Sequence, residues 1–321
     1  MNQADVVAAL ISAGIALVAG VLSGPTLIAW LYRLKYGQSI RTDGPQSHLK
    51  KAGTPTMGGF LIWFALLVSL ACQRIFSPMV GCLLLVTLGH ATLGYLDDYI
   101  KAVRKNPDGL SARAKLIGQF TLAGLFYALL LASEPQTIHI PIVNLEWHMG
   151  VLYPCFVVLY MVFFSNAVNF ADGIDGLNGG LCIIFSLICM VVAFAQGQQY
   201  LALLAAALVG ALVSFLVFNL HPAKLFMGDT GSLGLGAILA GMALLLRQEF
   251  ALLFAGIVFL AEMLSVIIQV LYFKRTGGKR FFRMAPIHHH FELLGWSEWR
   301  IDFTFWGIAG LASLVAYTLL I

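Results

Sequence analysis

The chain has 321 residues, of which 60% are hydrophobic and only 11% are charged, and its mean hydropathy is +0.88. Soluble domains average about 25% charged residues, so this composition excludes a soluble globular protein and indicates a polytopic membrane protein. The formal net charge of +4 is small, and it does not suggest nucleic-acid binding.

Apolar segments of about 20 residues, each long enough to cross a bilayer as a helix, recur along the chain. We predict an all-α polytopic membrane protein of about ten transmembrane helices, forming a single integral-membrane domain over residues 1–321. One longer connection, 133–149, alternates polar and apolar residues and predicts a small β-hairpin on the membrane surface. The expected spans are 6–31, 56–73, 79–98, 115–132, 150–168, 177–195, 200–219, 231–247, 250–273 and 301–321.

Basic residues gather on alternate connections, and this pattern predicts the orientation of the chain. If the first connection is cytoplasmic, every Lys and Arg except Arg74 and Arg247 lies on the cytoplasmic side. The positive-inside rule then places both termini on the external face. The motif-rich connections fall on the cytoplasmic side as well, so we expect a cytoplasmic-face active site.

The start of the second span, residues 48–59, reads H-L-K-K-A-G-T-P-T-M-G-G. A Gly-Thr-Pro turn before a helix N-terminus, with Lys50 and Lys51 beside it, is typical of an anion-binding site. Such lysines also bind lipid head groups without specificity, and that alternative stays open.

Two adjacent carboxylates, Asp97 and Asp98, lie at the cytoplasmic end of the third span, followed by Lys101. Adjacent residues point about 100° apart on a helix, so both carboxylates can face a common pocket only at its mouth. Asp98 and Lys101 are three residues apart and can form a surface salt bridge instead, but that pairing leaves Asp97 unsatisfied nearer the membrane.

The strongest concentration of polar side chains is S-N-A-V-N-F-A-D-G-I-D-G-L-N-G-G, residues 165–180. The glycines predict a helix end that runs into a turn, with the polar side chains converging on one cavity. Unpaired carboxylates cost about 2.5 to 3.5 kcal/mol each at the centre of a membrane helix, so they require a cation, a ligand or water. A solvated polar loop is the alternative, but it leaves the regular spacing unexplained. The polar residues recur at every third position, as Asn166, Asn169, Asp172, Asp175 and Asn178.

A third carboxylate, Asp229, lies between two glycines in F-M-G-D-T-G-S, residues 226–232, at the start of a span. This turn can present one carboxylate and several backbone N–H groups, and its glycines let a phosphate approach. We therefore expect Asp229 to be the principal metal ligand. The same residues would occur if an Asp or Thr only capped the following helix. The motif is therefore evidence for a ligand site only because it is the third cytoplasmic carboxylate site.

The longest basic loop contains P-I-H-H-H-F-E, residues 286–292. Three consecutive histidines cannot all reach one ion from a regular backbone, and no cysteine lies nearby, which argues against structural zinc. We expect one or two of these histidines to donate protons or hydrogen bonds to anionic oxygens, while another packs locally.

Carboxylates from three connections, surrounded by basic residues, suit a Mg²⁺ ion that bridges phosphate oxygens, because Mg²⁺ is usually held by one or two carboxylates together with phosphate and water. At the depth of a lipid phosphate, this combination predicts phosphoryl transfer between a cytoplasmic nucleotide-linked substrate and a membrane lipid. An ion-coupled transporter is the alternative from another class, but transporters place such groups near the bilayer midplane, between broken helices.

Five motifs together resemble those of the phospho-N-acetylmuramoyl-pentapeptide transferases (bacterial translocase I), in the polyprenyl-phosphate N-acetylhexosamine-1-phosphate transferase superfamily. They are G-T-P-T-M-G-G, L-D-D-Y-I-K, N-F-A-D-G-I-D-G-L, F-M-G-D-T-G-S and P-I-H-H-H-F-E, in the family's order. The resemblance implies Mg²⁺-dependent transfer of phospho-MurNAc-pentapeptide from UDP-MurNAc-pentapeptide to undecaprenyl phosphate, giving lipid I and UMP. It also implies a homodimer in the bacterial cytoplasmic membrane, embedded in the lipid bilayer.

The resemblance assigns roles to individual residues. The catalytic set falls on Asp97, Asp98, Asp229 and His288. The family's lysine falls on Lys51, but Lys50 is adjacent, so which of the two contacts the ligand stays open. The uridine-binding set falls on Asn169, Asp172, Asp175 and Phe226, with Gly228, Gln269 and His289 as neighbours, and Asn166 and Lys101 complete the expected substrate-binding residues.

Two alternatives remain within this resemblance. A related enzyme that acts on UDP-N-acetylglucosamine would share the carboxylate motifs, although H-H-H-F-E favours the muramoyl-pentapeptide donor. For the mechanism, either Asp97 deprotonates the lipid phosphate, which then attacks directly, or a carboxylate attacks first and forms a phospho-enzyme. We favour direct attack because undecaprenyl phosphate is already an anionic oxygen nucleophile.

Overall fold

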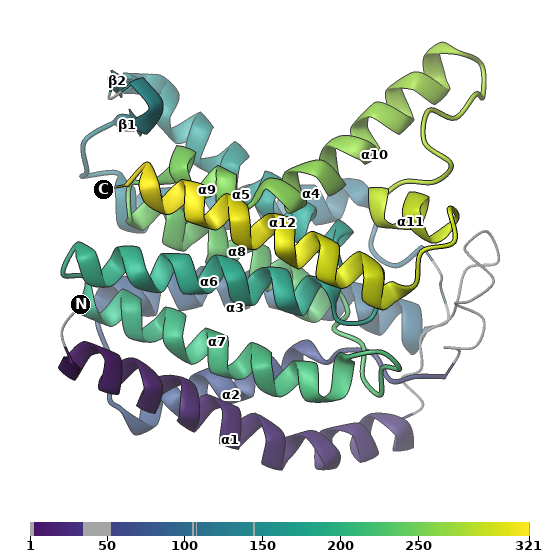
Figure 1. The fold of residues 1–321 in the computed structure, drawn as a ribbon, viewed down its shortest axis with the longest axis horizontal. Helices are drawn as coiled ribbons and strands as arrows, with labels where there is room; N and C mark the ends of the chain where they lie inside the picture. Colours follow the sequence, from purple (N-terminus) through teal and green to yellow (C-terminus); the bar gives the residue numbers. More distant parts are fainter. Residues whose placement is uncertain (1–2, 35–52, 105, 107, 144, 321) are drawn as a thin grey trace.

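The computed structural model describes residues 3–34, 53–104, 106, 108–143 and 145–320. Most of these residues form helices that run roughly parallel or antiparallel in one bundle, and α1 begins at the same end of the bundle at which α12 ends (Figure 1). The helices are α1 Gln3–Arg33, α2 Gly59–Cys72, α3 Pro78–Ala102, α4 Ala112–Phe126, α5 Tyr153–Phe170, α6 Leu177–Ala195, α7 Gln199–Asn219, α8 Asp229–Leu245, α9 Glu249–Ala255, α10 Ile257–Arg275, α11 Ile287–Glu292 and α12 Glu298–Thr318.

The lengths and composition of the helices confirm a multi-pass membrane protein. Within the described ranges, eight helical segments are long and apolar enough to cross a membrane, and α2 and α8 are apolar but shorter, with 14 and 17 residues. Each predicted span corresponds to helical structure.

The predicted ninth span, 250–273, is wrong as a single helix, because the chain breaks at Gly256 into α9 and α10. A Cβ atom at position 256 would lie 3.1 Å from Cζ of Phe164 and 3.4 Å from Cε2 of Phe185, so the backbone packs directly on two aromatic rings. After this break α10 leaves the bundle at a steep angle (Figure 1).

The predicted hairpin in 133–149 is confirmed, and it is the exception to the all-α prediction. Strands β1 Thr137–Ile140 and β2 Leu145–His148 pair antiparallel, with Thr137 opposite His148. The Arg247 guanidinium holds the hairpin to the bundle, because it donates to the carbonyl oxygens of Pro135, at 2.7 Å, and Thr137, at 3.3 Å. The hairpin lies at the end of the bundle where α1 begins (Figure 1).

Helix α8 is almost completely buried at the centre of the bundle, and small residues let its neighbours approach its backbone. A Cβ atom on Gly94 of α3 would overlap the backbone of Asp229, and one on Gly59 of α2 would overlap that of Gly231. Gly236 of α8 lies in the same way against the backbone of Ser165 in α5. These contacts bring the end of α3 and the start of α2 to the N-terminus of α8.

Candidate active site

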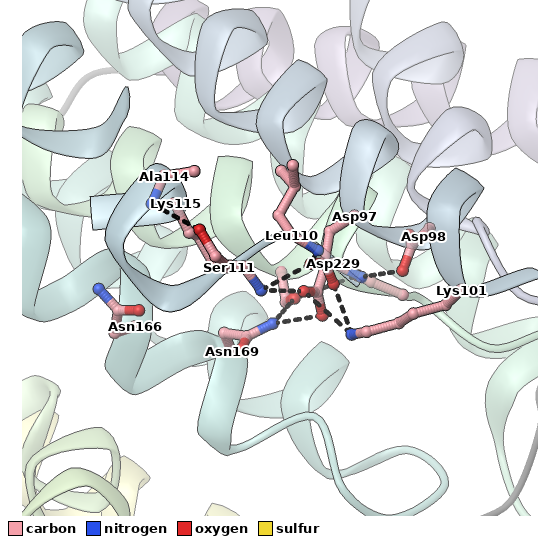
Figure 2. A network of polar contacts seen from close by, with 12 residues as sticks. Asp97, Asp98, Lys101, Leu110, Ser111, Ala114, Lys115, Asn166, Asn169 and Asp229 are labelled. Carbon is pink, nitrogen blue, oxygen red and sulfur yellow. Dashed lines mark hydrogen bonds and ion pairs between the residues drawn. The ribbon is translucent and has the colours of Figure 1, made fainter. Parts of the chain in front are cut away.

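Three carboxylates predicted from two separate motifs meet at the N-terminus of α8 (Figure 2). Asp97 and Asp98 come from the last turns of α3, and Asp229 is the first residue of α8. One oxygen from each lies within 4.8 Å of the other two. Asp97 and Asp98 are buried, whereas the Asp229 side chain is 15% exposed.

Two lysines join these carboxylates, and we refer to Asp97, Asp98, Lys101, Lys115 and Asp229 as the carboxylate–lysine cluster. The Lys101 Nζ atom lies 2.5 Å from Oδ2 of Asp97 and 3.5 Å from Oδ2 of Asp229. The Lys115 Nζ atom lies 2.8 Å from the same Asp229 oxygen and 3.3 Å from Oδ1 of Asp97. Lys101 therefore pairs with Asp97, not in the surface salt bridge with Asp98 that its spacing also allowed.

Lys115 was missed as a site residue by sequence reasoning, which counted it only among the basic residues of a connection. It lies in the first turn of α4, where Ser111 caps the helix by accepting from the Ala114 N–H, at 3.2 Å. No motif surrounds it. The one signal in the sequence is that Lys115 lies near the N-terminus of an apolar helix.

Asp98 holds the first turn of α8. Its Oδ1 atom accepts from the backbone N–H of Asp229, at 3.1 Å, and its Oδ2 atom accepts from both the N–H and the hydroxyl of Thr230, at 2.9 and 2.7 Å. The N-terminus of α8 carries no capping side chain of its own at Gly228. A carboxylate from another helix therefore satisfies the free N–H groups and the positive end of the helix dipole.

Asp97 has a second structural contact, because its Oδ1 atom accepts from the backbone N–H of Leu110, at 2.8 Å (Figure 2). This bond fixes the connection between α3 and α4. It thereby places Lys115, five residues further along the chain, over the carboxylates.

Only part of the polar row in residues 165–180 reaches the cluster. Asn169 donates to Oδ1 of Asp229, at 2.9 Å, and to the Ser232 hydroxyl, at 2.8 Å. Asn166 instead donates to Oε1 of Gln119, at 2.8 Å, and lies apart from the carboxylates in Figure 2. Helix α5 stays α-helical to Phe170, so a step of three residues turns about 300° and separates the two side chains.

The rest of the row contacts other elements, so the expected convergence of all five side chains on one cavity is not what the structure has. Asp175 accepts from the Ala223 N–H, at 3.0 Å, and lies 3.1 Å from Nδ1 of His221. Asn178 lies 3.3 Å from Sδ of Met227. These contacts tie the start of α6 to the connection between α7 and α8.

Asp172 lies in the turn 171–176 that joins α5 to α6. Its surroundings raise the pKa of its carboxyl to about 8, first through burial and then through the negative charges of Asp229 and Asp98. These surroundings favour the protonated form of the carboxyl. In that form it can donate a hydrogen bond to a ligand.

Phe226 and Gly228 lie beside the start of α2. The backbone N–H of Phe226 donates to the carbonyl of Pro55, at 2.8 Å, and its carbonyl accepts from Gly58, at 2.7 Å. Gly228 has a φ of 71°, and a Cβ there would lie 2.6 Å from Oδ2 of Asp98. Only glycine meets both conditions at this position. The expected Lys51 contact and the choice between Lys50 and Lys51 lie outside the described residues.

The histidines of α11 contact different partners, as expected for a motif that does not share one ion. His288 is fully buried and its Nδ1 atom lies 3.1 Å from Oε2 of Glu262 in α10. The Nδ1 atom of His289 lies 2.6 Å from Oε2 of Glu292. His290 packs locally, because its Nδ1 atom accepts from the Arg283 N–H, at 3.1 Å.

Gln269 shapes the loop that follows α10. Its Oε1 atom accepts from the backbone N–H groups of Phe281 and Phe282, at 3.1 and 2.9 Å. This arrangement leaves the Gln269 amide NH₂ group for other contacts.

The donor set of the cluster fits a bound metal ion. Three carboxylates face two lysines, so the cluster contains one more acidic group than basic groups. Both oxygens of Asp98 already accept from α8, which leaves Asp97 and Asp229 as the better ligands. Carboxylate oxygens are the ligands that hard divalent cations prefer.

Comparisons with known proteins agree with these motifs. Residues 80–247 match the family model of glycosyl transferase family 4, and residues 51–62 match signature 1 of the phospho-N-acetylmuramoyl-pentapeptide-transferases. The chain is 46% identical over 312 residues to the phospho-N-acetylmuramoyl-pentapeptide-transferase of Listeria innocua, covering 96% of both chains. It is 46% identical over 314 residues to the protein of that name from Bacillus mycoides, covering 95% of this chain and 96% of the relative.

Proposed function

Because the chain belongs to the phospho-N-acetylmuramoyl-pentapeptide-transferase family, we propose that it transfers phospho-MurNAc-pentapeptide from UDP-MurNAc-pentapeptide to undecaprenyl phosphate, giving lipid I and UMP. The observation that carries this proposal is the carboxylate–lysine cluster at the ends of apolar helices, in a chain 46% identical to such transferases over nearly its full length. That position suits a reaction between a water-soluble donor and a lipid acceptor.

The cluster has the charges that this reaction requires. Two phosphate groups must approach each other, and their mutual repulsion raises the barrier unless cations neutralise them. Lys101 and Lys115 are 35% and 20% exposed, so their ammonium groups can reach an incoming phosphate. We propose that Asp97 and Asp229 hold Mg²⁺, which when bound would neutralise charge on the phosphate oxygens.

The hydrogen bonds of the carboxylates favour direct attack over a phospho-enzyme. Both oxygens of Asp98 accept from the start of α8, and Asp97 is paired with two lysines and the Leu110 N–H. A carboxylate nucleophile needs a free lone pair with open access, and the two Asp98 oxygens are committed to three donors at the start of α8. In the direct route Asp97 takes any proton that remains on the lipid phosphate. A phosphate oxygen then bonds to the β-phosphorus of the donor while the bond to the UMP oxygen breaks.

We also propose that the site faces the cytoplasm of a bacterium, where the donor is made. Of the Lys and Arg residues that the structure describes, all except Arg74 and Arg247 lie in or beside the connections on this side, as the positive-inside rule requires for the cytoplasmic side. The family resemblance supports a homodimer.

The experiment that tests the function measures UMP release by the detergent-solubilised protein supplied with UDP-MurNAc-pentapeptide and undecaprenyl phosphate. We expect release that needs both substrates, stops when EDTA removes divalent cations, and returns with Mg²⁺. UDP-N-acetylglucosamine is the matched alternative donor. Faster release from that donor would assign the chain to the alternative substrate, and UMP exchange without lipid phosphate would favour the phospho-enzyme.

Phe226 is expected to stack on the uracil base, because its half-buried ring lies in the connection that leads to Asp229. Base–aromatic stacking contributes about 1 to 3 kcal/mol, so Phe226→Ala should weaken uridine-nucleotide binding about 5- to 150-fold. Calorimetric titration with UMP measures the change. Phe226→Trp should retain most of the affinity, and Phe64→Ala, at an exposed ring of α2, is the control. Unchanged affinity in Phe226→Ala would place the base elsewhere.

A further inference from the structure

A buried acid–histidine pair links α10 to α11. Glu262 is the acidic residue of α10, and its side chain is fully buried, as is that of His288. The Oε2 atom of Glu262 lies 3.1 Å from Nδ1 of His288. The pair belongs to neither the carboxylate–lysine cluster nor the hydrogen bonds of the other two histidines.

The outer atoms of the pair have no hydrogen-bond partner among the residues that the structure describes. These atoms are Oε1 of Glu262 and Nε2 of His288. The Nε2 atom points at Gly173 in the turn between α5 and α6, where a Cβ atom would overlap it and would lie 2.7 Å from Cε1 of the same ring. The free ring nitrogen therefore faces the turn that contains Asp172.

The number of protons in this pair follows from its burial. A carboxylate beside a neutral imidazole would leave one net negative charge, with Oε1 unsatisfied, at a site closed to solvent. A buried charge without compensation is strongly unfavourable. Two arrangements avoid it: a carboxylate beside an imidazolium, and a carboxylic acid that donates to Nδ1 of a neutral imidazole.

Both neutral arrangements place a hydrogen atom on Nε2. In the imidazolium each ring nitrogen carries a proton, and in the neutral ring Nδ1 accepts from the acid, so the ring proton must be on Nε2. We propose that Glu262 is a positioning residue that keeps Nε2 of His288 protonated, so that His288 donates a hydrogen bond to an anionic substrate oxygen and does not act as a base. The identity of that oxygen, on a phosphate of the donor or of the lipid, rests on the proposed function. The protonation of Nε2 does not depend on the proposed function.

The protonation pattern can be measured without any turnover. The protein is labelled with ¹⁵N-histidine in lipid nanodiscs, and the His288 signals are assigned by subtracting the spectrum of a His288→Asn variant. We expect a protonated Nε2 at neutral pH. Nδ1 is expected to be either unprotonated and accepting a hydrogen bond, or protonated in an imidazolium. A neutral ring with a proton on Nδ1 and a bare Nε2 would overturn the proposal.

Substitution of Glu262 by Gln distinguishes a donor from a base. The amide has the shape of the protonated acid and donates to Nδ1, so Nε2 keeps its proton and kcat should stay within about tenfold of the wild type. In Ser-His-Asp enzymes, where the histidine is a base, the matching amide substitution lowers kcat about 10⁴-fold because the proton moves to the wrong nitrogen. A loss of that size in Glu262→Gln would contradict the proposal.

Glu262→Leu removes the partner of Nδ1 and should lower kcat about 10- to 100-fold, with little change in the KM for the nucleotide donor. Equal kcat in the Gln and Leu variants would show that Glu262 has no positioning role. Glu249→Gln, at the buried acid of α9, is the control and should match the wild type. If the wild type releases no UMP, the proposed function fails, and the ¹⁵N measurement alone decides the inference.

Discussion

Asp229→Asn is expected to lower turnover by about 10³-fold or more while the protein remains folded. Asp229 is the carboxylate that both lysines approach, at 2.8 and 3.5 Å, and its other oxygen accepts from Asn169, at 2.9 Å. An amide keeps the shape of the side chain, but it removes the negative charge that pairs with the lysines and would bind the metal ion. UMP release measures the loss, and thermal unfolding monitored by circular dichroism measures the fold.

Asp108→Asn makes the same chemical change at an exposed carboxylate of the α3–α4 connection, so it should retain wild-type turnover. Near-normal activity of Asp229→Asn at saturating Mg²⁺ would contradict the assignment of Asp229 as the principal ligand. Loss of the folded state in Asp229→Asn would show that its contacts with the lysines and Asn169 are structural.

Asp98→Ala is expected to lower the free energy of unfolding by about 3 kcal/mol or more, because it leaves three donors at the start of α8 without their acceptor. These donors are the N–H of Asp229 and the N–H and hydroxyl of Thr230. Turnover should fall with stability, because Asp229 is the first residue of the helix that loses its cap. Unfolding by SDS titration measures the change in stability.

Thr230→Val removes only the hydroxyl donor and should lower the free energy of unfolding by about 1 kcal/mol. It serves as the graded comparison for Asp98→Ala. If Asp98→Ala is as stable as the wild type but inactive, then Asp98 acts on the substrate, as the family resemblance implies, and its contacts with α8 add little to stability.

The apolar spans could be predicted from the sequence because a membrane helix needs about 20 apolar residues, and that signal is local. The break at Gly256 could not, because the rings of Phe164 and Phe185 that pack on this glycine are distant in the sequence. The hairpin was predictable because alternation and prolines mark it locally. Its anchor, Arg247, was counted only as one of two external basic residues.

The candidate site was likewise predictable from the sequence only in part. Sequence motifs predicted that Asp97, Asp98 and Asp229 belong to one site, and the structure brings them together. The motifs did not predict Lys115 or Glu262, because neither residue lies in a motif and the partner of each comes from another segment. Regular spacing was also an incomplete guide, since Asn169 reaches the carboxylates while Asn166 bonds to Gln119.

The short lengths of α2 and α8 affect the depth at which the site lies. With 14 and 17 residues they extend about 21 and 25 Å, whereas the hydrocarbon core is about 30 Å thick. Both helices begin near the carboxylates, where the Gly59 N–H donates to the Met227 carbonyl, at 3.0 Å. The difference between helix length and core thickness therefore falls at the same place for both helices. Because α8 is enclosed by other helices, this difference is met inside the protein and not by lipid. The lipid acceptor and the nucleotide donor would then meet in a recess of the protein, where the donor's pyrophosphate need not enter hydrocarbon.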